Sequence, residues 1–248
     1  MGRGNRVHNK YPYFSVILYI LVLIPNFYVL CGTDPILGRT AVESVLAAGY
    51  SGKLYLMNNM DSDLSLLFSD LPVEVVDAPV KLTMAQTANW IVKLAIKQGQ
   101  DKILTLPDDA IIKPGAIEPL LERYEEVKNE KWLNIGYPSS SAFFTLANLN
   151  AYKEEQVWWD TFLFPMYWCD YHWLRIMRLR GWQDMFVEER NLVEHSGSEN
   201  IKRNPGMRVR NYMIFEFNKA TYEKIWGGEA GHETITDITA GGLENEGN

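Results

Sequence analysis

Two neighbouring carboxylates, Asp108 and Asp109, follow the apolar run Ile103–Leu106, separated from it by Pro107. A short apolar run bounded by turn residues is typical of a buried strand, so the run predicts a strand that carries both carboxylates to the edge of a sheet. Carboxylate oxygens suit a hard cation such as Mg²⁺ or Mn²⁺, which often shares its coordination with phosphate groups. A solvated turn is the alternative, because aspartate is common in turns.

Polar residues also follow two other predicted strands near the start of the chain. Thr33 and Asp34 come after the apolar run at 26–30, and the cluster Asn58–Asp63 comes after the run at 54–57. In open α/β sheets, ligands bind at the carboxyl ends of the strands, so the clusters predict a polar ligand there. The sequence has no Gly-x-Gly-x-x-Gly loop after the first strand and no P-loop motif. A standard dinucleotide-binding fold and a P-loop kinase are therefore disfavoured.

The elements that must position these residues alternate along the first half of the chain. Apolar runs predict strands, and apolar residues at helical spacing predict helices. The predicted strands are 26–30, 54–57, 73–76 and 102–106, and the predicted helices are 37–49, 83–99 and 117–127. This alternation with short connections indicates an α/β fold with a mostly parallel sheet. The second half is less regular, with a predicted strand at 142–146, a helix at 168–180 and a strand at 185–187.

The composition is that of a globular protein. Apolar residues make up 47% of the 248 residues and charged residues 22%, which suffices for a buried core. The formal charge of −7 comes from 31 acidic and 24 basic residues and predicts no nucleic-acid partner. The cysteines, Cys31 and Cys169, are too few for a four-cysteine zinc site or a disulfide framework.

The two ends of the chain differ in composition from its central part. Residues 1–25 combine a basic start with the eleven-residue run Phe14–Ile24, which is apolar apart from Ser15. This is the length of a signal-peptide core and is shorter than the roughly 20 residues that span a bilayer as a helix. Three interpretations of this segment stay open: a membrane anchor or appendage, a cleaved signal, and non-native residues from an upstream start codon. The expected location is cytoplasmic or membrane-associated through residues 11–25. Residues 236–248 predict a flexible acidic tail.

The segment Leu106–Ile117 resembles the metal-binding segment of family 2 glycosyltransferases with the GT-A fold. In that family an Asp-x-Asp motif precedes an apolar pair and Pro-Gly-Ala-Leu, and here Asp108 and Asp109 precede an apolar pair, Lys113 and Pro-Gly-Ala-Ile. Further segments resemble other motifs of the family in the same order, namely 58–63, 85–89, 142–160, 169–182, 193–198 and 224–228. The resemblance implies a single catalytic domain over residues 26–235, with a Rossmann-like GT-A sheet flanked by helices.

The resemblance also implies an enzyme that moves a sugar from a nucleotide-sugar, with a UDP-sugar favoured, to an acceptor hydroxyl in a metal-assisted, inverting reaction. The implied nucleotide-sugar-binding residues are Thr33, Asp34, Asn58, Asn89 and Asp108. Mn²⁺ or Mg²⁺ would bind Asp109 and His195 and neutralise the diphosphate leaving group. Asp170 would accept the proton of the acceptor hydroxyl.

Several of these residues have simpler interpretations, which stay open. Asp170 is alternatively a solvent-facing helix residue, and His195 an ordinary loop histidine. Trp158 and Trp159 are assigned to the acceptor, because adjacent residues on an extended chain cannot both face the core, whereas most tryptophans pack in the core. His172 lies between two aromatic residues and is expected to be packed rather than to bind a ligand.

The sequence departs from the family pattern at three positions. Pro107 stands first in the Asp-x-Asp motif, Cys169 replaces the glutamate of a Glu-Asp pair, and Ala88 replaces the arginine of an Arg-Asn helix start. Pro107 and Cys169 motivate the alternative function, a catalytically inactive module of the same fold that binds a nucleotide-sugar or glycan. A glycoside hydrolase needs two carboxylates about 5 to 9.5 Å apart across a sugar. Asp108 and Asp109 are neighbours and point different ways on a strand, so this function is disfavoured.

A basic segment precedes the last part of the domain. Lys202, Arg203, Arg208 and Arg210 place four bases within nine residues, interrupted by Asn-Pro-Gly. We expect a flexible loop there, which is either merely solvated or closes over a diphosphate or a phosphorylated acceptor.

Overall fold

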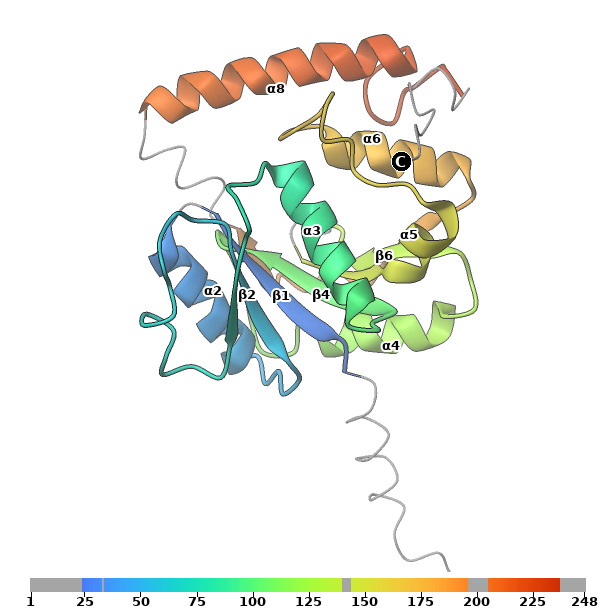
Figure 1. Ribbon diagram of the computed structural model, residues 1–248. Coiled ribbons are helices and arrows are strands. Elements are labelled where there is room, and N and C mark those ends of the chain that lie inside the picture. Colours follow the sequence, from blue (N-terminus) through green and yellow to red (C-terminus); the bar gives the residue numbers. More distant parts are fainter. Residues whose placement is uncertain (1–23, 33, 140–143, 196–204, 237–248) are drawn as a thin grey trace, which may run out of the picture.

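The computed structural model describes residues 24–32, 34–139, 144–195 and 205–236 (Figure 1). Several residues that the sequence analysis singled out lie outside these ranges. They are Thr33, residues 1–23, which hold most of the apolar segment, and residues 237–248, which hold most of the acidic tail. Parts of the motifs at 142–160 and 193–198, and the bases Lys202 and Arg203, also lie outside the described ranges.

The first half of the chain forms four parallel strands in the order β3-β2-β1-β4. Their bounds are β1 (Asn26–Cys31), β2 (Leu54–Asn58), β3 (Glu74–Asp77) and β4 (Lys102–Pro107). Cys31 pairs with Asn58 and Leu30 with Pro107, so the central strands end together at one edge. The four predicted strands are confirmed, and the residues that follow them meet at this carboxyl edge of the sheet.

Three predicted helices are also confirmed, as α2 (Pro35–Ala47), α3 (Met84–Lys97) and α4 (Glu118–Val127). The start of α2 is encoded locally, because the Asp34 side chain accepts a hydrogen bond from the Ile36 N–H at 2.9 Å and Pro35 occupies the first turn. The start of α3 is a capping box between Thr83 and Gln86. Since α2 follows β1 and α3 follows β3, both helix N-termini lie at the carboxyl edge.

The second half extends the sheet to seven strands in the order β3-β2-β1-β4-β7-β6-β8. It adds β6 (Trp132–Gly136), β7 (Thr145–Asn148) and β8 (Gln183–Phe186). β7 runs antiparallel to both β4 and β6, whereas β8 is parallel to β6. The short strands β5 (Ala110–Ile112) and β9 (Val193–His195) form a separate antiparallel pair. The described sheet is thus mostly parallel, as expected.

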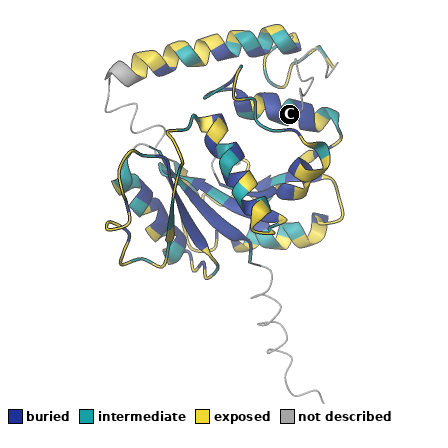
Figure 2. Ribbon diagram, in the orientation of Figure 1, coloured by how far each residue is buried: buried dark blue, intermediate teal, exposed yellow. Residues whose placement is uncertain are grey.

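Helices cover both faces of the sheet, and Figure 2 shows the central strands largely buried between them. Successive residues of β1 face opposite sides, because side chains alternate along a strand. Phe27 and Val29 join the core under α2 and α4, whereas Tyr28 joins the core under α3 and α6. Burial on both faces explains why β1 and β2 are continuous apolar runs rather than alternating patterns.

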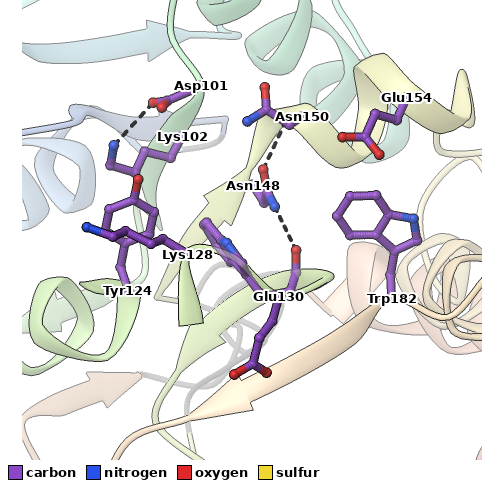
Figure 3. Close-up of a pocket in the computed structure, with 10 residues that line it drawn as sticks. Asp101, Lys102, Tyr124, Lys128, Glu130, Asn148, Asn150, Glu154 and Trp182 are labelled. Atoms are coloured by element: carbon purple, nitrogen blue, oxygen red, sulfur yellow. Dashed lines mark hydrogen bonds and ion pairs between the residues drawn. The ribbon is translucent and has the colours of Figure 1, made fainter. Parts of the chain in front are cut away.

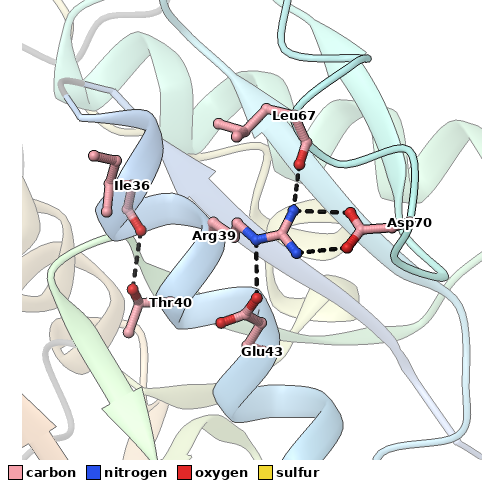
Figure 4. Close-up of polar contacts among 6 residues, drawn as sticks. All are labelled: Ile36, Arg39, Thr40, Glu43, Leu67 and Asp70. Atoms are coloured by element: carbon pink, nitrogen blue, oxygen red, sulfur yellow. Dashed lines mark hydrogen bonds and ion pairs between the residues drawn. The ribbon is translucent and has the colours of Figure 1, made fainter.

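A polar cluster around Arg39 fixes the loop that follows β2 onto α2 (Figure 4). The Arg39 guanidinium forms two bonds with the Asp70 carboxylate, at 2.8 and 2.7 Å, and also donates to the Leu67 carbonyl. It donates to Glu43 on its own helix at 2.9 Å. The Arg39 guanidinium lowers the pKa of Asp70 to about 2. This cluster anchors one side of the long connection between β2 and β3.

Three further helices complete the described fold: α5 (Leu149–Glu155), α6 (Cys169–Leu179) and α8 (Pro205–Trp226). α6 confirms the helix predicted at 168–180. α8 lies across α6 at one end of the molecule (Figure 1). It corrects the prediction of a basic loop, because the helix begins at Pro205 and carries Arg208 and Arg210 as exposed residues. Pro205 looked like a helix breaker, but proline is favoured in the first turn of a helix, where its missing N–H costs no hydrogen bond.

The localisation expected from the sequence needs correction. Among residues 24–32, 34–139, 144–195 and 205–236, no helix combines the length and the apolar character required to cross a membrane. Residues 11–23 of the predicted apolar segment are not among those described. We therefore withdraw the expectation of a cytoplasmic or membrane-associated location and assign none in its place.

Candidate functional site

Asp109 and His195 come together through the pairing of β5 with β9. Ala110 lies opposite His195 in this antiparallel ladder, which places Asp109 beside the imidazole. His195 Nε2 lies 3.2 Å from Asp109 Oδ1, and the two side chains are 21% and 16% exposed. The two residues are far apart in the sequence, so the resemblance alone predicted their proximity. The structure confirms that they meet.

The donor atoms of this pair fit a hard or borderline divalent cation. A carboxylate oxygen and an imidazole nitrogen are both ligands that Mn²⁺ accepts. Two ligand atoms on adjacent corners of an octahedron, each about 2.1 Å from the metal, lie about 3 Å apart, close to the spacing of Asp109 and His195. In the described part of the chain, no group of three or more His, Cys, Asp or Glu residues could hold a metal ion. The pair therefore supplies two ligands at most, and phosphate oxygens and water would complete the coordination.

Asp108 connects the end of β4 to the end of β1. Its Oδ2 accepts a hydrogen bond from the Gly32 N–H at 3.0 Å. Burial, with the Asp108 and Asp34 carboxylates nearby, raises the pKa of the Cys31 thiol to about 12. Cys31 is therefore a protonated core residue and not a nucleophile. Asp34 lies at the same edge, where it caps α2.

Lys81 contributes a positive charge to this edge, which the sequence analysis did not identify. Its Nζ donates to the Gly32 carbonyl at 2.9 Å and also to the Asn59 carbonyl. The lysine thus joins the ends of β1 and β2 beside Asp108. Its position in the connection from β3 to α3 was the available signal, because such connections line the carboxyl edge.

Asn58 has its hydrogen-bonding groups directed inward. Its Nδ2 donates to Asp77 Oδ1 at 2.7 Å and to the Ser62 carbonyl at 2.8 Å, and its Oδ1 accepts from the Met60 N–H at 3.0 Å. The residue is 2% exposed. Both donors of a carboxamide are therefore used internally. Asn58 orients the carboxylate of Asp77, an exposed residue at the end of β3 that the sequence analysis did not single out.

Asn89, Trp158 and Trp159 are brought together by hydrogen bonds and ring contacts within the fold. Both amide atoms of Asn89 bond the main chain of Trp159. The Trp159 Nε1–H donates to Tyr152 Oη at 3.1 Å, and the Trp158 ring lies under Lys93 Nζ at 4.9 Å from its centroid. Both tryptophans are partly buried. Their rings line the junction of α3, α5 and α6 and leave only part of their surface to solvent.

Asp170 follows a segment of the chain that contacts the start of α3. The segment before α6 crosses the start of α3, where the Ala85 N–H donates to the Pro165 carbonyl at 3.2 Å. Asp170 then lies in the first turn of α6. Burial raises the pKa of its carboxyl, an effect partly offset by hydrogen bonds from the N–H groups of Tyr171 and Asp170 itself. A carboxylate with a raised pKa is a stronger proton acceptor.

His172, one turn further along α6, is packed as predicted. It is 1% exposed, and its Nδ1 accepts a hydrogen bond from Trp226 Nε1 at 3.0 Å. Burial lowers the pKa of His172 to about 4, so the ring is neutral at physiological pH.

A small pocket of about 110 Å³ lies at the opposite edge of the sheet, where β4 begins (Figure 3). Two of its charged residues, Lys102 and Asp101, pair with each other. Lys102 Nζ lies 3.2 Å from Asp101 Oδ1 and 4.4 Å from the centroid of the Tyr124 ring. Asn148 Nδ2 donates to the Trp132 carbonyl at 2.7 Å. This pocket is remote from the residues that follow the parallel strands, and its polar groups serve the fold.

The arrangement of strands and helices matches a solved structure. S. aureus TarS superimposes with a TM-score of 0.54 at 11% sequence identity, over 76% of this chain and 39% of TarS. The chain has the GT-A fold. The fold implied by the sequence resemblance is thereby confirmed. Since the match extends over 39% of TarS, this GT-A domain corresponds to about two fifths of that protein.

Two weaker matches accompany it. TarS 1–349 in complex with UDP-GlcNAc gives a TM-score of 0.49 at 11% identity, over 84% of this chain and 74% of that one. GalNAc-T7 with UDP, GalNAc and Mn²⁺ gives 0.36 at 14% identity, over 46% and 23%. No protein-family model and no curated protein matches the sequence.

Proposed function

We propose that the chain is a glycosyltransferase that transfers a sugar from a nucleotide-sugar, with a UDP-sugar favoured, to an acceptor hydroxyl with inversion. The observation that carries this proposal is the contact between Asp109 and His195, at 3.2 Å, at the edge of a GT-A sheet where ligands bind. The fold shared with TarS, a protein also solved with UDP-GlcNAc, supports a nucleotide-sugar as the donor.

On the donor side, the nucleotide diphosphate would lie along the ends of β1, β2 and β4. Asp34, Asp108 and the Gly32–Lys81 contact line this edge, and Thr33 belongs to the same connection. Asp109 and His195 would hold Mn²⁺ or Mg²⁺. A divalent cation there supplies charge neutralisation for the departing diphosphate.

On the acceptor side, Asp170 acts as the general base. Its carboxylate takes the proton from the acceptor hydroxyl while the hydroxyl oxygen forms a bond to the anomeric carbon. The bond from that carbon to the diphosphate breaks on the opposite face, and the nucleoside diphosphate leaves with the electron pair. One base and one displacement give an inverted product. Trp158 and Trp159 would contribute their exposed edges to the acceptor sugar.

A screen of nucleotide-sugars by thermal stabilisation, with and without Mn²⁺, tests the proposal, because a ligand that binds the folded state raises the melting temperature. We expect a UDP-sugar to stabilise the protein only when Mn²⁺ is present. Release of free UDP from that donor, with a panel of hydroxyl acceptors, then tests catalysis. If no nucleotide-sugar stabilises the protein under either condition, the proposal is wrong.

The alternative, a catalytically inactive binding module, is favoured by Cys169 in place of a glutamate immediately before Asp170. The two functions separate in the same experiment. An inactive module would be stabilised by the UDP-sugar and Mn²⁺ but would release no UDP with any acceptor.

A further inference from the structure

The first turn of α6, which carries Asp170, begins from an unusual backbone conformation. Trp168 precedes α6 with φ of 68°, in the left-handed region that residues other than glycine rarely adopt. No side chain caps the helix start at Trp168. Such a conformation persists only where surrounding contacts determine it. The contacts that hold Trp168 therefore decide where Asp170 lies.

These contacts come largely from α8. The Trp168 ring is 9% exposed and packs against Phe215 and Tyr222 of α8, with ring centroids 5.7 and 5.2 Å away. Asn218, also on α8 and 2% exposed, donates from Nδ2 to the Tyr167 carbonyl at 2.9 Å. An aromatic platform and a buried hydrogen bond thus fix the two residues directly before α6.

A third contact holds the other side of the same turn. The His172 N–H donates to the Trp168 carbonyl at 2.9 Å, closing the first turn of α6 around Cys169, Asp170 and Tyr171. The His172 ring in turn accepts the Trp226 Nε1–H at 3.0 Å, and Trp226 is fully buried. Contacts from α8 therefore reach both ends of the turn that carries Asp170.

We propose that α8 positions Asp170, with Asn218 and Trp226 as positioning residues that hold the first turn of α6. The inference rests on the proposed function for the role of Asp170 as base, but the structural part of it stands on these contacts alone. Asn218 binds the Tyr167 carbonyl and Trp226 binds the His172 ring, so they act on Asp170 through the residues on either side of it.

The buried thiol of Cys169 offers a direct readout of this turn. It is adjacent to Asp170 and fully buried, and its Sγ lies 3.2 Å from the Met166 carbonyl oxygen. Cys31, equally buried under α2, serves as an internal reference. We expect N-ethylmaleimide to label Cys169 about five- to tenfold faster in Asn218→Ala and in Trp226→Phe than in the native protein, because each variant loses a buried hydrogen bond and the turn opens locally. The labelling rate of Cys31 should not change.

Matched controls lie on the outer face of the same helix. Tyr212 and Phe217 are 65% and 69% exposed, so Tyr212→Ala and Phe217→Ala change α8 without touching α6. Both should label Cys169 at the native rate. Equal rates in the native protein and in both inner-face variants would overturn the proposal, as would a parallel rise at Cys31, which reports global unfolding.

Turnover completes the test. In Asn218→Ala and Trp226→Phe, we expect the affinity for UDP and Mn²⁺ to stay native by calorimetry while kcat for UDP release from the donor falls about tenfold. Faster labelling of Cys169 with native kcat would overturn the positioning role. Absence of turnover in the native protein would instead contradict the proposed function, and the labelling rates would still decide whether α8 holds the turn.

Discussion

Asn89 and Trp159 are joined by two reciprocal hydrogen bonds. Asn89 Nδ2 donates to the Trp159 carbonyl at 2.9 Å, and Asn89 Oδ1 accepts from the Trp159 N–H at 3.0 Å. Asn89 is 8% exposed. Only a carboxamide presents a donor and an acceptor side by side in this way. The pair ties α3 to the segment that leads into α6, the helix that carries Asp170.

The Asn89–Trp159 pair predicts that the stability of the fold depends on the amide group of Asn89. Asn89→Asp keeps the acceptor but loses the donor and places a carboxylate against the Trp159 carbonyl. We expect the unfolding free energy to fall by about 1–3 kcal/mol, because a buried backbone group is left unsatisfied. Urea denaturation measures the change. Lys97→Ala, on an exposed position of the same helix, should have little effect, and an equal loss in both variants would contradict the assigned role.

The Asp109–His195 pair predicts metal-dependent nucleotide binding. Asp109→Ala and His195→Ala should each weaken Mn²⁺-dependent UDP binding by at least about tenfold, because a metal ligand is lost. Calorimetry with UDP, with and without Mn²⁺, gives the measurement. Glu194→Gln is the matched control, because Glu194 lies next to His195 on β9 but pairs with Lys113 at 2.5 Å. Binding that is indifferent to both alanine variants would remove the metal role.

Asp170 predicts opposite effects on activity and stability. Its pKa is raised mainly by burial, so the folded state binds the proton more tightly than the unfolded state does. Stability then decreases as pH rises through the pKa of the folded state, and a neutral isostere should be more stable at pH 7. We expect Asp170→Asn to abolish sugar transfer and to raise the melting temperature at pH 7.

The pH dependence separates this effect from general stabilisation. Below the ordinary aspartate pKa of about 3.9, the carboxyl is protonated in both states, so the gain of Asp170→Asn should disappear. Melting curves of both proteins across this range test it. A gain that persists at pH 3, or retained turnover, would count against Asp170 as a base whose pKa is raised by partial burial.

Gly38 leaves no room for a larger side chain between α2 and the end of β1. A Cβ at this position of α2 would lie 2.7 Å from Cys31 Sγ, at the end of β1. Alanine gains about 1 kcal/mol over glycine from helix propensity, but overpacking a core costs about 1–3 kcal/mol. We expect Gly38→Ala to destabilise the fold by chemical denaturation. Adding Cys31→Ala should recover most of the lost stability, because it removes the sulfur atom that the new Cβ would meet. A Gly38→Ala protein of native or higher stability would contradict this prediction.

The parallel half of the fold was predictable because its signals are local. The β1 and β2 runs are long enough to be recognised, and Asp34, Thr83 and Gln86 mark helix starts in the sequence itself. A strand was predicted at 142–146, close to β7, but the antiparallel direction of β7 and the helix α8 were not predictable in this way. Pairing of β7 between β4 and β6 depends on distant partners. The Asn-Pro-Gly segment at the start of α8 favours a loop as much as a helix start.

The candidate site was predictable in part. Asp109 and His195 meet as the resemblance implied, but the inward hydrogen bonds of Asn58 could not be inferred from its residue type. Its partners are Ser62, in the connection after β2, and Asp77, at the end of β3, and only the folded chain brings them together. Lys81 was overlooked for the same reason, since its partners are backbone carbonyls that carry no signal in the sequence.

The β5–β9 ladder has a consequence for how the protein is made. β1 to β5 end at Ile112, whereas His195 belongs to β9. During translation, the carboxylate of Asp109 therefore leaves the ribosome long before the imidazole that faces it. A nascent chain can assemble the parallel strands early, yet it acquires its paired oxygen and nitrogen donors only when synthesis has passed residue 195.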